Sequence, residues 1–406
     1  MTTHTPRWYF GWNIVAAATL LTLLTVGMRM SIGPFFLPMA QSLQLSRSDL
    51  SEIVAIGMLC YGLGMPLAGH LVGRWGTRPV LLMGTVIVGL STWWTVIARD
   101  YISLLLAYGV LMSVGFSFTS PVALTPVISR WFVRRRGMAL FFLSTGSMAG
   151  IAVLTPALNL SIERLGWTST MAGFAMIFAL LTIPVALFVI RENAPEHADQ
   201  TAPLPAPSAN ASATPPTMAL GAAFLSGPFW LIATGMFACG FSMNLIGTHG
   251  IPMLMDHGFD AMTSSLGIGL IGLVAIFSTL VLGRISDVVP RKYILGAIYF
   301  IRGLGFIALL VVGTHAELYG ASVVGGLVWA GSIALSSAIL ADVYGVKLVG
   351  VLYGTAYLIH QIGAMISSWL GGYAFEAWGT HWIAFGGAAL LLDIGALISL
   401  RLPHQR

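Results

Sequence analysis

The sequence has 406 residues, of which 57% are hydrophobic and 8% are charged, with a formal net charge of +5. An average soluble domain carries roughly 25% charged residues, so this composition excludes an ordinary water-soluble enzyme or binding module. The hydrophobic residues fall into blocks of about 20, which is the helix length that crosses a hydrocarbon core of about 30 Å. A membrane β-barrel would instead show short alternating segments.

Twelve membrane-spanning helices are predicted in chain order. The first six cover residues 9–34, 49–73, 79–98, 101–129, 137–162 and 168–190. The next six cover residues 226–254, 262–286, 292–313, 317–342, 347–375 and 381–401. Between the two sets the chain is rich in Pro, Ala, Ser and Thr, a composition typical of disordered segments. We therefore expect a bundle over 1–190, a disordered cytoplasmic linker over 191–222 and a second bundle over 223–406.

The two sets of helices repeat each other at a nearly constant offset. Residues match at a spacing of 213 or 214 in the pairs Gly33/Gly247, Pro38/Pro252, Met39/Met253, Ser51/Ser265, Gly69/Gly283, Gly137/Gly350 and Gly150/Gly363. An all-α integral membrane protein of two parallel six-helix pseudo-repeats is predicted. Two such bundles that rock about a central site are the architecture of alternating access. This architecture favours a transporter, and we expect it to function as a monomer.

The distribution of basic residues predicts the orientation. Nearly all Lys and Arg residues fall on one side if both termini are cytoplasmic, as the positive-inside rule expects. The positive net charge is therefore a topology signal, and no nucleic-acid partner is expected. We predict a multi-pass protein of the inner or plasma membrane. No pattern for catalysis, metal binding or a cofactor is found, and Cys60 and Cys239 are interpreted as apolar filling.

The loops after the second and eighth helices carry a motif. Gly69-His-Leu-Val-Gly-Arg-Trp-Gly-Thr-Arg78 and Gly283-Arg-Ile-Ser-Asp-Val-Val-Pro-Arg-Lys292 both resemble Gly-x-x-x-Asp-Arg-x-Gly-Arg-Arg, the signature of the major facilitator superfamily. Glycines allow close helix approach, and the charged groups can latch helix ends in one conformation. The predicted latch residues are Gly69, Arg74, Arg78, Gly283, Asp287 and Arg291. Gly73 and Val288 depart from the motif.

A second resemblance is to bacterial porters of the monocarboxylate type. It rests on Arg130-Trp-Phe-Val-Arg-Arg-Arg-Gly-Met-Ala139 with the small residues of Gly146–Gly150, and on Tyr9-Phe-Gly-Trp12. That family's Asp-x-x-x-Arg element falls here on Ala275 and Thr279, so the element is absent. The family's first-helix lysine aligns with a methionine, and neither assignment is carried over.

Three ionisable residues lie inside predicted spans, where a charge needs a partner or a role. Arg302 and Asp393 have similar predicted depths on peripheral helices, so a structural ion pair is the favoured interpretation over a transport role. Arg29, in the outer half of the first helix, is the best candidate for an anion contact through two parallel hydrogen bonds. The alternative is an arginine that reaches up to the membrane interface.

Further candidate substrate-binding residues are polar groups on the central helices. His360 can bind substrate or carry a coupled proton, with a buried, neutral histidine as the alternative. The complete set is Arg29, His360, Gln361, Asn244, His249, Tyr61 and Tyr357. His249 is expected near a helix break at Pro252, where it would form an outer gate with Asn244. The two tyrosines offer hydroxyls to the cavity or simply pack.

The favoured function is proton-coupled transport of a small organic anion, with a monocarboxylate as the first candidate. One alternative is a carrier or efflux pump for a neutral or amphipathic solute, which the missing eighth-helix element favours. A third hypothesis is a membrane sensor that keeps the fold without transport, because fold alone does not prove function. The expected partners are the small-molecule substrate, a proton and the lipid bilayer.

Overall fold

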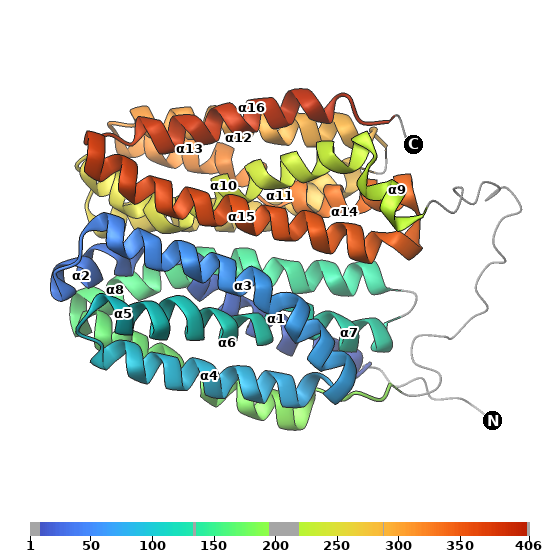
Figure 1. Ribbon diagram of the computed structural model, residues 1–406, viewed down its shortest axis with the longest axis horizontal. Coiled ribbons are helices and arrows are strands. Elements are labelled where there is room, and N and C mark those ends of the chain that lie inside the picture. Colours follow the sequence, from blue (N-terminus) through green and yellow to red (C-terminus); the bar gives the residue numbers. More distant parts are fainter. Residues whose placement is uncertain (1–8, 133–134, 195–218, 287, 404–406) are drawn as a thin grey trace, which may run out of the picture.

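The computed structural model describes residues 9–132, 135–194, 219–286 and 288–403, and within these ranges the chain forms helices joined by short turns (Figure 1). No β-strand occurs in the described ranges. Helices satisfy their backbone hydrogen bonds internally, which is what a lipid environment requires of so apolar a chain.

The described residues of the first half form eight α-helices and two π-helical segments. They are α1 (Gly11–Met30), α2 (Gly33–Leu43), α3 (Arg47–Trp75), α4 (Thr77–Ile97), α5 (Tyr101–Leu104), η1 (Leu105–Met112), α6 (Ser113–Phe118), α7 (Pro121–Trp131), α8 (Arg136–Pro184) and η2 (Val185–Val189).

The second half continues with the same kind of element. It comprises α9 (Leu220–Phe224), α10 (Gly227–Asp256), α11 (Ala261–Ile285), α12 (Arg291–Val311), α13 (His315–Leu327), α14 (Gly331–Tyr344), α15 (Val346–Trp378), the π-helical η3 (Trp382–Gly386) and α16 (Gly387–Ser399). The short helix α9 overlaps the end of the predicted linker, and residues 191–194 at the start of that segment form no helix. Its centre lies outside the described residues.

The number of membrane spans agrees with the prediction. Eleven stretches of the described chain are long and apolar enough to cross a membrane. The longest, Met138–Val189, is interrupted at Gly166, where φ is 78° and ψ is 161°. Glycine adopts this left-handed φ without a side-chain clash. The stretch therefore contains two spans, and the fold has the twelve predicted helices.

One predicted helix break is misplaced. The break expected near Pro252 is wrong, because α10 runs through that proline without interruption from Gly227 to Asp256. The corresponding break occurs in the first half instead, where α1 ends at Met30 and α2 starts at Gly33. A single proline is tolerated in a membrane helix when neighbouring groups satisfy the freed carbonyl.

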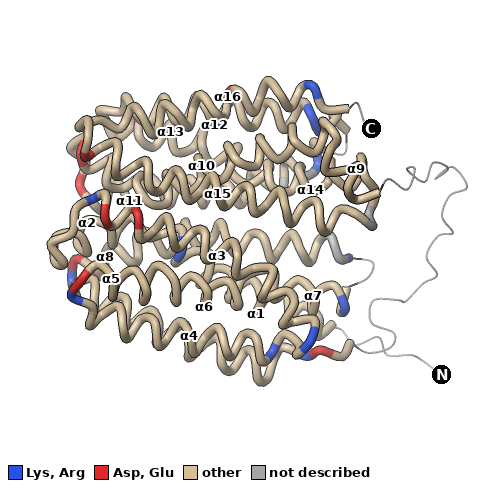
Figure 2. The backbone as a smooth tube through the Cα atoms, in the orientation of Figure 1, with Lys and Arg blue, Asp and Glu red and all other residues tan. Residues whose placement is uncertain are grey.

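The two halves lie side by side, with both ends of the chain at the same end of the molecule (Figure 1). We call that end the termini end. The opposite end, which carries the turns 44–46, 98–100, 257–260 and 379–381, is the distal end. Lys and Arg residues gather at the termini end, whereas Asp and Glu residues lie mainly at the distal end (Figure 2).

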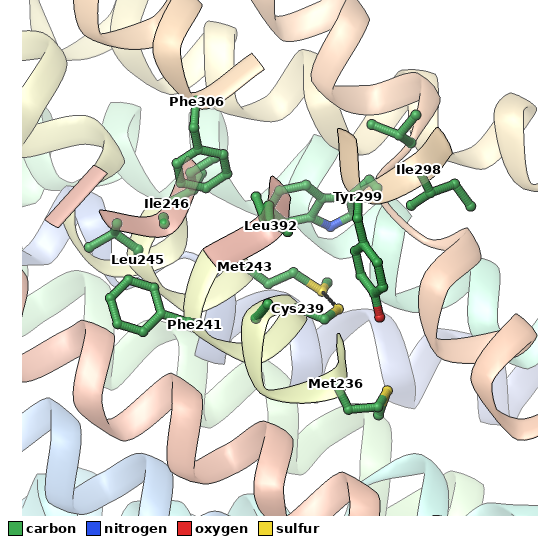
Figure 3. Packing of buried hydrophobic residues seen from close by; sticks show 14 of the residues in the cluster. Met236, Cys239, Phe241, Met243, Leu245, Ile246, Ile298, Tyr299, Phe306 and Leu392 are labelled. Atoms are coloured by element: carbon green, nitrogen blue, oxygen red, sulfur yellow. Dashed lines mark hydrogen bonds between the residues drawn. The ribbon is translucent and has the colours of Figure 1, made fainter. Parts of the chain in front are cut away.

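The buried hydrophobic side chains of the described chain form three clusters, two mainly in the first half and one mainly in the second. Figure 3 shows part of the core of the second half, where aromatic and sulfur-containing side chains from α10 pack against α12 and α16. Cys239 donates its thiol hydrogen to the Met243 thioether at 3.5 Å, and Tyr299 and Phe306 are fully buried beside them. The core is thus filled without charge, apart from one arginine described below.

The halves touch along α3 and α15 and along α8 and α11. A methyl group on Gly372 of α15 would lie 1.9 Å from the Ser51 hydroxyl of α3, near the distal end. One on Gly62, midway along α3, would lie 2.8 Å from Cβ of Gln361. Towards the termini end, a methyl group on Gly73 or Gly354 would meet no atom of another described segment within 4 Å. The halves are therefore in contact at the distal end and midway along α3, whereas these two glycines nearer the termini end make no such contact.

Candidate functional site

The last turn of α1 places Arg29 at the junction of the two halves. Its Nη1 donates to Oδ1 of Asn244, on α10 of the other half, at 3.1 Å, and to the Met58 thioether of α3 at 2.9 Å. The guanidinium carbon lies 4.5 Å from the centre of the Tyr61 ring. Met58 and Tyr61 are three residues apart, so they share one face of α3. A cation, an amide and an aromatic ring from three helices thus converge.

The middle of α15 supplies the second part of the site. The rings of Tyr357 and His360 are stacked, with centroids 5.0 Å apart and an angle of 9° between their planes. His360 and Gln361 are 2% and 0% exposed, and none of their side-chain nitrogen and oxygen atoms has a hydrogen-bond partner. Buried polar atoms without partners are rare and require an explanation, such as an absent ligand or water.

The charge of Arg29 is not neutralised by the protein. Among the described residues no carboxylate lies within 4.0 Å of it, and its Nε is buried without a partner. Arg29 is close enough to influence Tyr108, Tyr357 and His360 electrostatically. A small cavity borders it, lined by Val54, Gly57, Met58, Tyr108, Met112, Ser113 and Phe116. The cavity has room for about one water molecule, so the surrounding helices would have to move apart to admit a carboxylate-bearing solute.

The structure brings six of the seven candidate substrate-binding residues to this junction: Arg29, Tyr61, Asn244, Tyr357, His360 and Gln361. His249 lies apart from them. Its Nε2 is 2.7 Å from the backbone carbonyl of Ser368, and its ring meets that of Phe36 from the first half at 5.0 Å. His249 therefore packs between the halves and is already hydrogen-bonded.

The predicted ion pair between Arg302 and Asp393 is wrong, because the described chain forms no such contact. Arg302, 1% exposed, donates from Nη2 to the backbone carbonyls of Val328, at 2.6 Å, and of Trp329. These carbonyls follow the end of α13, where carbonyl groups lack helical partners and attract a cation. The Asp393 Oδ1 has no hydrogen-bond partner. It lies against Gly303 of α12, where an added methyl group would be only 2.7 Å from it.

At the termini end, the predicted latch residues contact groups of their own half. Arg78 donates to the backbone carbonyl of Ile190, and Arg291 forms an ion pair with Asp342. Arg74 is exposed, and Gly69 on α3 lies beside Val122, at 3.7 Å from an added methyl group. Gly283 lies within α11, and Asp287 falls outside the described residues.

Several contributing residues were missed by sequence reasoning. Glu192 accepts a hydrogen bond from the Thr77 backbone N–H and pairs with Arg130, each at 2.5 Å. Glu192 is an acidic residue in a part of the sequence where the other charged residues are mainly basic, and this pattern could have indicated an ion pair. Met58 could have been predicted as a site residue, because it lies one helical turn before the candidate Tyr61 and therefore on the same face of the helix. Tyr108 gave no signal, because its helix is uniformly apolar.

Comparison with known proteins agrees with this architecture. The family model of the Major Facilitator Superfamily matches residues 18–314 and 250–406. A crystal structure of a bacterial homologue of the human lysosomal transporter Spinster, in an inward-facing and occupied conformation, superposes with a TM-score of 0.69, covering 97% of each chain at 16% identity. The chain belongs to the Major Facilitator Superfamily, and it is a membrane transporter of that family.

Among curated relatives, the uncharacterised MFS-type transporter YcxA of Bacillus subtilis is 26% identical over 96% of this chain and 94% of its own length. Human monocarboxylate transporter 11 is 28% identical over 98% of this chain and 84% of its own. A fujikurins efflux protein of Gibberella fujikuroi is 23% identical over 97% and 83%. The chain is thus related to monocarboxylate transporters along its full length.

Proposed function

We propose that this protein moves a small organic anion with one carboxylate across the membrane by alternating access, together with a proton. The observation that carries the proposal is the unpaired guanidinium of Arg29 at the junction of the halves. A guanidinium holds a carboxylate through two parallel hydrogen bonds, and away from water this attraction is strengthened. Relationship to monocarboxylate transporters supports the same class of substrate.

Each remaining polar group has a role in this mechanism. Asn244 orients the guanidinium, and Tyr61 covers its face. Gln361 offers an unpaired amide to a polar substituent of the substrate. We assign the coupled proton to His360, because both of its ring nitrogens are without partners and a neutral imidazole keeps one nitrogen that can accept a proton.

The bundles 1–190 and 223–406 are the proposed moving bodies, joined by the segment 191–222. Concentration of Lys and Arg at the termini end supports a cytoplasmic location for that end and for both termini. In this orientation the contact between Gly372 and Ser51 lies on the outside, and it supports a described conformation that is closed on that side. The termini-end pairs formed by Arg78 and Arg291 would then hold each bundle rigid while the two bundles rock.

The test is uptake by the purified protein in proteoliposomes, with lactate, pyruvate and oxalate as labelled substrates and with or without an inward proton gradient. We expect gradient-stimulated accumulation of the singly charged acids. Arg29→Gln is expected to weaken their binding by roughly 10- to 100-fold, the effect of losing hydrogen bonds to a charged group. Arg29→Lys should fall in between, because it keeps the charge without the paired donors.

The matched control is Arg99→Gln, which removes an equal charge from an exposed site at the distal end. Equal binding by wild type and Arg29→Gln would refute the assigned site. No uptake of any carboxylate by folded protein would favour the alternative, a neutral or amphipathic solute.

A further inference from the structure

At the distal end a charged cluster joins the two halves. Arg47, at the start of α3, forms two hydrogen bonds with Asp256 at the end of α10, from Nη1 to Oδ2 at 2.6 Å and from Nη2 to Oδ1 at 2.9 Å. Its guanidinium also lies 4.3 Å from the centre of the Phe375 ring of α15. Beside it, the Ser48 backbone N–H donates to Glu376 at 2.9 Å. These contacts exist only while the halves meet at this end.

His257, the residue after Asp256, has an unusual pair of hydrogen-bond partners. Its Nδ1 lies 2.7 Å from the backbone carbonyl of Met253, and its Nε2 lies 3.0 Å from that of Leu310 at the end of α12. A carbonyl oxygen only accepts hydrogen bonds, whereas a neutral imidazole has a single N–H. Both contacts are therefore satisfied only when His257 is an imidazolium. Its position at the C-terminus of α10 favours the same positive charge.

The surrounding groups hold this histidine beside the cross-bundle contact. The His381 ring lies against that of His257, with centroids 6.1 Å apart and planes at 30°, and its Nε2 is 2.9 Å from Asp256 Oδ2. The titratable and charged groups in the neighbourhood are Arg47 of α3, His249 and Asp256 of α10, Asp260 at the start of α11, His315 and Glu317 of α13, Glu376 of α15 and His381 in the turn that follows. From α12 the contact is the Leu310 backbone carbonyl.

We infer that protonated His257 is a switch that keeps the distal end closed. The imidazolium ties the end of α10 to α12 and adds a positive charge next to Asp256, so the carboxylate stays in place for Arg47 of the opposite half. When the proton leaves, one of the two carbonyls loses its donor, and the end of α10 is released. The closed state is therefore favoured while the proton is bound and is weakened when the proton leaves.

This switch goes beyond the proposed function, because it acts at the distal entrance and does not depend on which solute is carried. It is also separate from the proton assigned to His360 at the centre. A proton held at His257 is exposed to the distal compartment, so it makes the conformation respond to the pH of that compartment.

The test is a distance measurement across the distal end by electron–electron double resonance. Spin labels are attached to Arg99→Cys and Ala316→Cys, two exposed positions on opposite halves, in a full-length background without Cys60 and Cys239. The ligand-free protein in nanodiscs is measured from pH 5.5 to 8.5. We expect the ratio of the short to the long distance to fall about tenfold between the two ends of this pH series, the effect of one charge-assisted hydrogen bond.

Three variants separate the possible sources of such a change. His257→Gln keeps one amide donor and does not titrate, so its distribution should no longer depend on pH. His257→Lys keeps a cation over the whole range and should stay closed. His315→Gln removes another histidine from the same end, one whose ring lies against that of Phe259, and should behave as wild type.

A wild-type distribution independent of pH would overturn the inference, as would a dependence that survives in His257→Gln. Loss of the dependence in His315→Gln would also overturn it, by showing that the effect is not specific to His257. Because the readout is made without substrate, these results stand apart from any failure of carboxylate transport.

Discussion

Arg29 of α1 and Asn244 of α10 meet across the two halves, with the guanidinium Nη1 3.1 Å from the amide Oδ1. The amide group is fixed in this orientation because its Nδ2 donates to the Gly240 carbonyl at 3.0 Å. The oxygen therefore faces the cation, and α10 of one bundle contacts the proposed anion-binding group of the other. Movement of the halves changes this contact directly.

Replacing Asn244 with Asp is expected to place a carboxylate of the protein where it competes with the substrate for Arg29. The new carboxylate would pair with Arg29, so binding of a transported carboxylate should fall at least about tenfold, whereas the protein should fold as before. Binding to detergent-purified protein by calorimetry measures the effect. Gln41→Glu adds the same charge at an exposed site and serves as control. Unaltered affinity in Asn244→Asp would show that Arg29 does not bind the substrate.

His360→Gln is expected to separate substrate movement from proton movement. Exchange of substrate between the two sides should continue, whereas accumulation driven by an inward proton gradient should be lost, because glutamine cannot take up a proton. The control is His70→Gln, which removes an exposed histidine from the termini end of α3. Accumulation by His360→Gln at the wild-type level would move the coupling site elsewhere.

Gly372→Ala is expected to hinder closure of the distal end. The added methyl group would lie 1.9 Å from the Ser51 hydroxyl and 2.7 Å from the Arg47 carbonyl, distances that the packed helices cannot accommodate without separating. Transport should slow at least about tenfold, since the closed state is part of every cycle. Gly354→Ala, which meets no described atom of another segment, should be neutral. Equal rates in the two variants would contradict this account of the interface.

Arg302→Met is expected to lower the free energy of unfolding by about 1–3 kcal/mol, because the Val328 and Trp329 carbonyls lose their donor in a buried site. Thermal unfolding in detergent measures the loss. The double exchange Arg302→Asp with Asp393→Arg should not restore stability, since these two side chains are not paired. Recovery in the double variant would reinstate an ion pair between them.

The twelve spans could be predicted because span length and hydropathy are properties of one helix at a time. The same holds for Arg29, whose position inside a span already demanded a role. The sequence also placed Tyr61, Tyr357 and His360 on helices expected to face the centre. Their convergence depends on how the two halves pack together, which the sequence does not give.

The sequence could not predict which face of a helix a side chain lies on. Similar depth of Arg302 and Asp393 along their helices suggested a pair, but depth does not fix the face of each helix. The Val328 and Trp329 carbonyls that bind Arg302 belong to a break between α13 and α14 that hydropathy does not reveal. Cross-bundle partners such as Arg47 and Asp256 are likewise invisible until the two halves are docked.

The turns at the distal end are short, and the helix interruption at Gly166 joins two spans with hardly any chain between them. No loop of the described chain is long enough there to fold over the entrance as a lid. A solute arriving from that side meets helix ends directly, so its capture waits on the parting of whole bundles. The rate of solute binding from the distal side should therefore be set by how often the two bundles move apart. No separate kinetic phase for the ordering of a loop is expected.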